Sequence, residues 1–194
     1  YDFTGRKPVE GAVSLNMICG GLVTLYFEYI GISPKAFIFG GGHVGLCTAD
    51  VLGKLDYDIT LVDDRSSEHE SKEYEYVFGD YKEVIDKLDI EDGCFIVISG
   101  YSHEIDYEIL KSVYSKGCKP KYIGLLASNN KASYMRQKLI EELDSAPDFS
   151  SLYSPVGLDI GGSAPCEIAI SIVSEIQSIR YGKGSINHLT GKWV

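Results

Sequence analysis

One stretch, residues 35–65, constrains the fold of this chain more than any other part. It begins with a short apolar run at 36–39, passes through three glycines at the spacing G-x-G-x-x-G, and continues as a helix-like segment over 43–55. A second apolar run at 59–62 then ends on Asp63. Strand, glycine turn, helix, strand and acid in this order predict a Rossmann-type dinucleotide-binding unit.

Each of the three glycines has a physical reason in such a unit. Gly40 allows a sharp turn, Gly42 lets the backbone approach a pyrophosphate, and Gly45 lets the helix pack closely against the strand. The start of the helix offers free N–H groups and a partial positive charge to an anion. Asp63 follows Gly45 by 18 residues, where its carboxylate can accept hydrogen bonds from a ribose diol. The alternative is a glycine turn that only closes a parallel sheet.

Strands and helices alternate through the rest of the chain, as the periodicity of its apolar residues indicates. Further strands are predicted at 74–78, 94–98, 122–126 and 152–156, and further helices at 81–88, 104–116, 129–143 and 166–181. Because this alternation requires right-handed crossovers, the predicted fold class is α/β, with a Rossmann-like, doubly wound parallel sheet.

A short β segment precedes the Rossmann unit. Residues 13–30 alternate in the manner of strands and are interrupted by Cys19-Gly20-Gly21. Because two strands alone are marginal and the chain starts at Tyr1 without a methionine, we expect a truncated second domain. The expected parts are residues 1–34 as this remnant plus a linker, 35–182 as the Rossmann-like domain, and 183–194 as a tail. An exposed strand edge left by the truncation would favour a homodimer.

The overall composition limits the kinds of partner. A net charge of -10 argues against nucleic acid and against an anionic membrane surface, since both attract basic patches. The five cysteines are odd in number and widely spaced, with no C-x-x-C pair, which fits a reducing cytoplasm and gives no zinc or iron–sulfur signature. No apolar run reaches the length that spans a bilayer, and no signal peptide is visible.

Ligands of open parallel sheets bind beyond the carboxyl ends of the strands. Four notable loops are expected at that edge, namely residues 40–45, 99–103, 126–131 and 157–166. One crevice could therefore gather all four loops. Ser128 in the third loop is also expected to act as the N-cap of the helix that follows.

Several polar residues near this edge have two interpretations each. His43 either donates to a phosphate or substrate or is a neutral histidine that caps the turn, and His103 is either a ligand or acid–base group or a hydrogen-bonded loop residue. Asp80 either contacts an adenine edge or caps the next helix. Arg65 pairs either with a phosphate near the ribose or with nearby carboxylates.

The cysteines divide in the same way. Cys166 falls in the first turn of a predicted helix, where the dipole favours the thiolate, so it is either reactive or a small buried side chain. Cys19 could be an accessible thiol at a domain edge, whereas Cys47, Cys94 and Cys118 look structural. Since no Ser/His/Asp or Cys/His arrangement can be assigned from spacing, a plain dehydrogenase is disfavoured.

Six blocks of sequence, in order, resemble the xanthine dehydrogenase accessory protein family (XdhC/CoxF). The blocks are MICGGLVTLYFEYI at 17–30, IFGGGHVG at 38–45, LVDDR at 61–65, SHEID at 102–106, YIGLLAS at 122–128 and VGLDIGGSAPCEIAISIVSEI at 156–176. The resemblance implies a chaperone that binds molybdenum cofactor, supports its sulfuration by a cysteine desulfurase, and delivers it to a xanthine dehydrogenase-type apoenzyme. It implies a cofactor carrier rather than a catalyst.

Carried over position by position, the resemblance gives a set of cofactor-binding candidates. They are Cys19, Gly40, Gly42, His43, Val44, Gly45, Asp63, His103, Ser128, Lys131, Asp159, Gly161 and Gly162; Asp80 is added for its place after the predicted strand at 74–78. Two loops depart from the family. Ala127-Ser128-Asn129-Asn130-Lys131 replaces a G-S-R-R-K type loop and so loses two guanidiniums, and Ala164-Pro165-Cys166-Glu167 stands where T-P-E-E is usual. Any role of Cys166 is therefore not inherited.

Two other functions remain open. The unit from Gly40 to Asp63 suits NAD, which would make the chain a regulatory module or an oxidoreductase, and a carboxylate at Asp63 disfavours the phosphate of NADP. The other is a scaffold that docks partner proteins and leaves the crevice empty.

Overall fold

The computed structural model describes residues 31, 33–65, 71–143 and 146–183. These residues form six strands and five helices. The strands are β1 (Lys35–Phe39), β2 (Asp58–Asp63), β3 (Glu75–Phe78), β4 (Phe95–Ile98), β5 (Tyr122–Leu125) and β6 (Leu152–Tyr153). The helices are α1 (His43–Gly53), α2 (Tyr81–Lys87), α3 (His103–Ser115), α4 (Asn129–Glu142) and α5 (Pro165–Arg180).

The sheet has the strand order β3-β2-β1-β4-β5-β6, and every neighbouring pair is parallel. Strand β1 lies in the middle of the sheet. From β1 the chain continues to β2 and β3 on one side, and it then crosses over to β4, β5 and β6 on the other. The predicted doubly wound α/β fold is thus confirmed. Its switch point lies between β1 and β4, where such sheets bind ligands.

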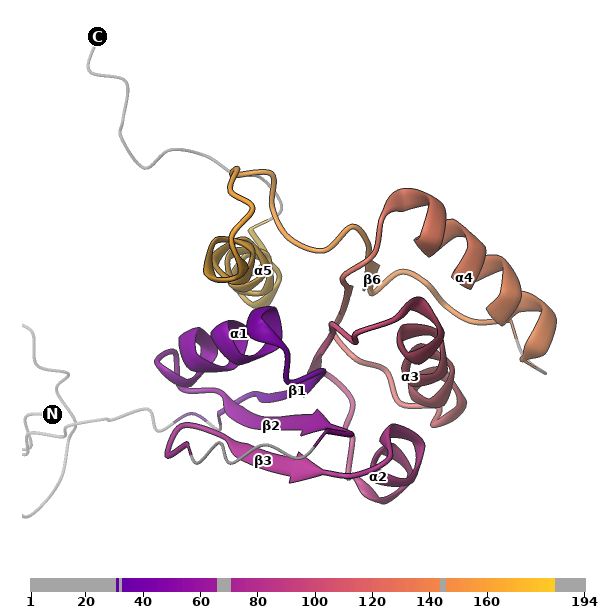
Figure 1. The fold of residues 1–194 in the computed structure, drawn as a ribbon, viewed down its shortest axis with the longest axis horizontal. Helices are drawn as coiled ribbons and strands as arrows, with labels where there is room; N and C mark the ends of the chain where they lie inside the picture. The colour runs from indigo at the N-terminus through magenta and orange to yellow at the C-terminus, as the bar shows by residue number, and fades with distance from the viewer. Residues whose placement is uncertain (1–30, 32, 66–70, 144–145, 184–194) are drawn as a thin grey trace, which may run out of the picture. The chain divides into compact units, whose positions relative to one another are not determined.

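Helices cover both faces of the sheet, with α1 and α5 on one side and α2, α3 and α4 on the other (Figure 1). Alternating side chains of the strands supply a hydrophobic core on each face. On one face, Ala36 and Ile38 of β1 pack with residues of α1 and α5; on the other, Phe37 and Phe39 pack with residues of α2, α3 and α4. The central strand β4 is buried at all four positions, as its uninterrupted apolar run predicts. The sheet and the helices on its two faces form three layers. Because the strands are parallel, their carboxyl ends lie at one edge of the sheet.

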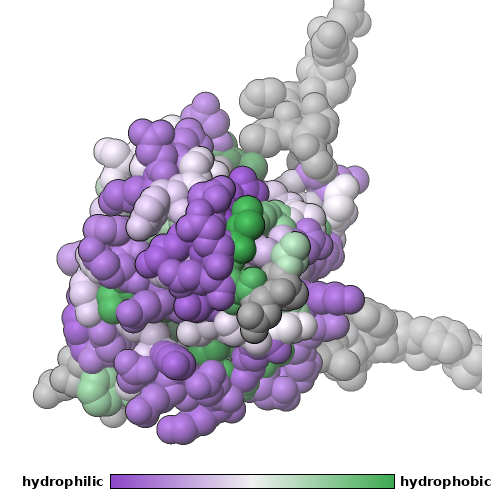
Figure 2. Space-filling model, turned by 90° about the vertical axis from the view of Figure 1, so that its right-hand side faces the viewer, coloured by the Kyte–Doolittle hydropathy of each residue, from purple (hydrophilic) through white to green (hydrophobic). Residues whose placement is uncertain are grey.

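The outer surface on the side of α2, α3 and α4 is largely hydrophilic (Figure 2). Hydrophobic residues show on that face only in small areas. No helix in the described part of the chain is both long enough and apolar enough to cross a membrane.

The last strand is shorter than expected. The sequence predicts a strand over 152–156, but β6 ends at Tyr153. Beyond it, the Ser154 hydroxyl, rather than a backbone N–H, donates to the carbonyl of Leu125, at 3.0 Å. Pro155 has no N–H to continue the ladder, so the chain leaves the sheet there.

The parts expected outside the Rossmann unit cannot be compared in the same way. The β segment at 13–30, including Cys19, and the tail from residue 184 onward lie outside the described residues.

Candidate functional site

The glycine turn after β1 is built by two close backbone contacts. Gly40 has φ +111°, and a Cβ there would lie 2.2 Å from the carbonyl oxygen of Ser99. A Cβ on Gly45 would meet the carbonyl oxygen of Gly40. Both glycines are therefore required by the fold itself, because any larger residue would separate α1 from β1 and β4.

Gly42 differs from these two glycines. Its backbone is extended, with φ -74° and ψ 179°, and a Cβ there would have no atom within 4 Å. It occupies the N-cap of α1, where no side chain caps the helix. The turn therefore presents uncapped backbone N–H groups beside empty space, and His43 and Val44 are the first two residues of the helix.

The carboxylate of Asp63 is almost fully buried and has four close donors. Its Oδ2 accepts from the Gly41 N–H at 2.5 Å and from an Arg65 Nη at 2.8 Å, and its Oδ1 accepts from the Arg65 backbone N–H and Nε at 2.8 and 2.9 Å. Burial alone would raise the pKa of Asp63, but the Arg65 guanidinium and these two backbone N–H groups hold it below its usual value. Asp63 therefore links the end of β2 to the glycine turn.

Arg65 extends this arrangement toward the loop after β4. Its guanidinium lies 5.1 Å from the centre of the Tyr101 ring, and the Tyr101 hydroxyl donates to Oδ2 of Asp64 at 2.9 Å. Among the described residues, the other oxygen, Asp64 Oδ1, is buried without a hydrogen-bond partner. The prediction that Arg65 pairs with nearby carboxylates is confirmed, and the partner is the motif acid itself.

The loop after β4 is held by the first turns of α3. The buried Asp106 accepts from the Gly100 N–H at 2.7 Å, and Ser102 caps α3 by accepting from Ile105. Burial raises the pKa of Asp106 to about 6, against the opposing effects of the Gly100 N–H and of the charges on Lys131 and His103. His103 is half exposed, and its Nε2 lies 2.9 Å from Glu104.

The start of α4 stands next to this loop. Ser128 occupies the N-cap position as predicted, but its hydroxyl makes no capping hydrogen bond. Lys131 is exposed in the first turn of α4, and its positive charge acts to lower the pKa of Asp106. This helix end therefore offers backbone donors, a hydroxyl and an ammonium group to an anion.

The second glycine loop is held by three side chains of α5, spaced four residues apart. Glu175 accepts from the Gly157 N–H at 2.9 Å, and the Ser171 hydroxyl donates to the Leu158 carbonyl. Glu167 accepts from the N–H groups of Ser163 and Ala164, each at 2.9 Å. Three glycines of this loop have positive φ and turn the chain, namely Gly157, Gly161 and Gly162. Asp159, in the same loop, is exposed.

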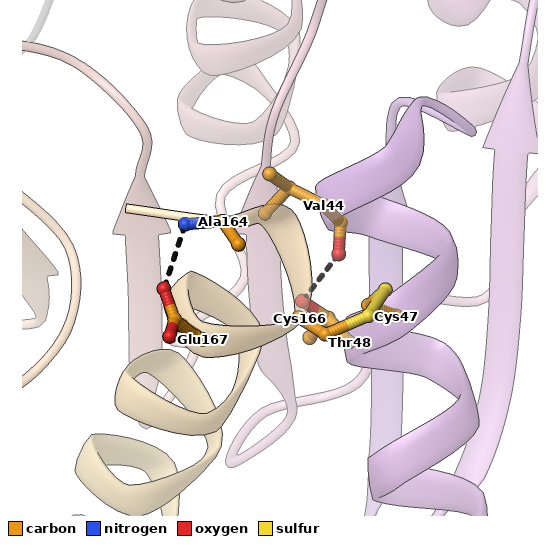
Figure 3. The surroundings of a disulfide bond; sticks show 6 residues. All are labelled: Val44, Cys47, Thr48, Ala164, Cys166 and Glu167. Carbon is orange, nitrogen blue, oxygen red and sulfur yellow. Dashed lines mark hydrogen bonds between the residues drawn. A yellow bond between two sulfur atoms is a disulfide. The ribbon is translucent and has the colours of Figure 1, made fainter. Parts of the chain in front are cut away.

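A disulfide joins Cys47 of α1 to Cys166 of α5 (Figure 3), at a sequence separation of 119 and with 5.3 Å between their Cα atoms. The interpretation of Cys166 as a small buried side chain is wrong, since the residue is exposed at the helix start. The sequence gives no sign of this pair, because only the packing of α1 on α5 brings the two residues together. Cys94 is a free buried thiol and Cys118 a free, partly buried one.

Most of the candidate residues lie along one edge, where neighbouring loops are linked. The glycine turn contacts Asp63 and Ser99, the loop after β4 lies beside Lys131, and the disulfide connects α1 to the start of α5, which follows the second glycine loop. Asp80 is exposed and caps α2 by accepting from the Glu83 N–H. Sequence reasoning missed Asp106 and Glu175, because neither stands next to a motif glycine.

Two surface hollows lie elsewhere. One of about 420 Å³ is lined by the C-terminal part of α3 and by residues 146–151, and one of about 430 Å³ lies between α2 and α3. Neither includes the glycine turn.

The comparison with known families decides the identity of this unit. Residues 36–176, more than half of the chain, match the family described as the XdhC Rossmann domain. The chain belongs to this family. The resemblance seen in the sequence blocks is thus confirmed, and the site lies within the matched part of the XdhC Rossmann domain.

Three relatives place this XdhC Rossmann domain among larger proteins. The chain is 28% identical over 186 residues to uncharacterized protein YqeB of Escherichia coli (strain K12), covering 92% of the chain and 33% of YqeB. It is 25% identical over 160 residues to a protein of Bacillus subtilis (strain 168) named as a probable xanthine dehydrogenase subunit, covering 80% of the chain and 46% of that protein. The crystal structure of a xanthine dehydrogenase from Bacillus halodurans matches with a TM-score of 0.65 and 25% identity, covering 81% of the chain and 45% of that structure. The chain thus spans between a third and a half of these relatives.

Proposed function

We propose that this chain binds molybdenum cofactor at the edge that carries the glycine turn, supports its sulfuration, and delivers it to a xanthine dehydrogenase-type apoenzyme. Membership of the XdhC family and two relatives named for xanthine dehydrogenase support the association. The observation that carries the ligand site is Gly42, where a glycine faces open space at an uncapped helix start although its backbone angles do not require glycine.

The residues at this edge fit the anionic end of such a cofactor. The first turn of α1, from Gly42 to Val44, supplies backbone donors for a phosphate. Ser128 and Lys131 at the start of α4 supply a hydroxyl and a positive charge. The cofactor brings the molybdenum chemistry; the chain's part is to hold the phosphate and keep the loops around it in place.

A carrier role agrees with the hydrogen bonds at this edge. In the described part of the chain, no hydrogen bond joins a nucleophilic side chain to His43 or His103. The Nε2 atom of His103 instead lies beside the carboxylate of Glu104. Sulfuration therefore calls for an external sulfur donor, and we propose a cysteine desulfurase in this role, with the apoenzyme as recipient.

The arrangement of Asp63 disfavours NAD as the primary ligand. A ribose diol needs free acceptor positions on this carboxylate, but both oxygens already accept from Gly41 and Arg65. NAD would have to displace the Arg65 guanidinium before it could use Asp63.

The proposal is tested by anaerobic calorimetric titration of the reduced protein with molybdenum cofactor, and separately with NAD and NADP. We expect saturable binding of the cofactor. Gly42→Ser should weaken it at least tenfold, which corresponds to about 1.4 kcal/mol, because the new side chain fills the space that the ligand enters. The same substitution should leave the free energy of unfolding nearly unchanged, since serine is a good N-cap residue.

Ala146→Ser serves as the matched control, because it adds the same hydroxyl at an exposed position away from this edge. It should bind like the parent protein. Binding of NAD without the molybdenum cofactor would refute the carrier proposal. Equal cofactor affinity of the parent and the Gly42→Ser protein would refute the placement of the site.

A further inference from the structure

The cysteine pair between α1 and α5 lies where the two helices enter the ligand edge. Cys166 is the second residue of α5, and Cys47 lies in the second turn of α1 (Figure 3). Cys166 is exposed and Cys47 partly exposed, so a small reagent can reach the bond between them. Their Cα separation of 5.3 Å is within the usual range for disulfides.

The two helices are also held together by apolar packing. Behind the cysteines, Ala49 and Leu52 of α1 belong to the same buried cluster as Ile172 and Val173 of α5. This apolar contact holds the two helices together whether the thiols are joined or free. The bond joins the N-terminal ends of the two helices, where Val44 of α1 and Ile168 of α5 are only partly buried against the same cluster.

Those two ends carry the two glycine loops. The glycine turn leads directly into α1, and the second loop is attached to α5 through Glu167 and Ser171. A covalent link between Cys47 and Cys166 therefore fixes the spacing of one loop relative to the other. Without the link, the start of α5 and its loop are tied to α1 only by noncovalent contacts.

We propose that Cys47 and Cys166 form a thiol–disulfide exchange site that takes small-molecule disulfides as reactants and locks the second glycine loop to the glycine turn. The proposal needs no bound cofactor and stands independently of the carrier function.

The exchange balances with glutathione disulfide as oxidant. The Cys166 thiolate, which the helix N-terminus stabilises, attacks one sulfur of the reagent, and one glutathione thiolate leaves and takes up a proton. The Cys47 thiolate then attacks the Cys166 sulfur of the mixed disulfide and displaces the second glutathione. Two protein thiols are oxidised to one disulfide, and one glutathione disulfide is reduced to two glutathione molecules.

The other described cysteines are poor competitors. Burial raises the pKa of the Cys94 thiol to about 12, and burial also raises the pKa of Cys118. Both therefore stay protonated near neutral pH, and the protonated thiol is not the nucleophile.

The test equilibrates the full chain in buffers of increasing ratio of glutathione disulfide to glutathione. Rapid alkylation and peptide mass spectrometry then identify each thiol and each cross-linked peptide. We expect the Cys47–Cys166 peptide to appear reversibly. Amide hydrogen exchange over residues 158–166 should be slower in the oxidised protein by at least about threefold.

Cys47→Ser should abolish the change in exchange rate, and Cys118→Ser, the matched control, should leave it intact. Two results would overturn the proposal. One is a mixed disulfide with glutathione at Cys166 that Cys47 never resolves. The other is a Cys47–Cys166 bond that forms without any change in amide exchange over the loop.

Discussion

The pair formed by Asp63 and Arg65 joins a buried carboxylate to a half-exposed guanidinium at the end of β2. Because the pKa of Asp63 is lowered in the folded protein, its charged form adds stability above the ordinary carboxylate pKa of about 4. This contribution is lost as the pH falls through the lowered value. Without the Arg65 guanidinium, burial is opposed only by the two backbone N–H groups, so the charged carboxylate becomes less favourable.

Arg65→Ala should therefore lower the free energy of unfolding by about 1 kcal/mol at pH 7, a value that allows for solvent screening of the exposed guanidinium. The deficit should shrink as the pH falls below about 4, because the carboxylate is then protonated in the variant. Urea unfolding at a series of pH values measures it. A deficit that stays constant between pH 3 and pH 8 would contradict the assignment, and adding Asp63→Asn should remove the pH dependence.

For single residues, the sequence predicts where a polar side chain lies better than which group it bonds to. The spacing after the glycine turn locates Asp63 correctly, yet its partner is Arg65, two residues away, which spacing rules do not address. Asp80 likewise lies at the end of β3, where the chain geometry makes it a helix cap. Which acceptor a donor chooses depends on side-chain directions that follow only from the folded chain.

The helices at the ligand edge differ in how their starts are used. Ser102 caps α3 with its side chain, whereas α1 and α4 have no side-chain cap. In α5, Glu167 binds the backbone just before the helix, and Glu175 reaches the start of the same loop from deeper in the core. The N-terminal backbone N–H groups of α1 and α4 thus have no side-chain cap, whereas side chains of α5 hold the second glycine loop.

Glu175→Ala should lower the free energy of unfolding by about 2–4 kcal/mol, because it leaves the Tyr122 hydroxyl and the Gly157 N–H without their acceptor. Glu175→Gln keeps an oxygen of similar reach and should cost less than half as much. Glu108→Ala, an exposed change on α3, is the control and should fall within about 0.5 kcal/mol of the parent. Denaturant unfolding compares the three, and equal costs for alanine and glutamine would contradict the acceptor role.

Almost every element could be located from the sequence, because apolar periodicity and glycine punctuation report directly on local structure. The boundary of β6 could not, since Ser154 bonds to Leu125 through its side chain. The pairing of Cys47 with Cys166 could not either, because it arises from the packing of two helices that are far apart in sequence.

As a whole, the Rossmann unit supplies both of its own hydrophobic cores. Within the described residues, the buried members of the two clusters fall between residues 36 and 176, on both faces of the sheet. Burial of this kind is the main driving force of folding, so the unit contains what it needs for cooperative stability.

A fragment of residues 33–183 should therefore fold and unfold cooperatively, with a free energy of unfolding within about 1 kcal/mol of the full chain. Circular dichroism during urea unfolding checks this. A shorter fragment ending at residue 163 is the control, and it should not fold cooperatively, because it lacks Ile172, Val173 and Ile176 of the core. Noncooperative unfolding of the longer fragment would show that the unit depends on residues outside it.

Three side chains of α5 make four hydrogen bonds to the second glycine loop, and all four reach main-chain atoms of that loop. The path of the loop is consequently encoded in the helix, and the loop's own exposed side chains are free to vary. Asp159, Ile160 and Ser163 are exposed, so we expect substitutions of their side chains to leave the fold unchanged. If the edge binds a ligand as proposed, a designed library at these three positions should alter its ligand preference while the scaffold stays the same.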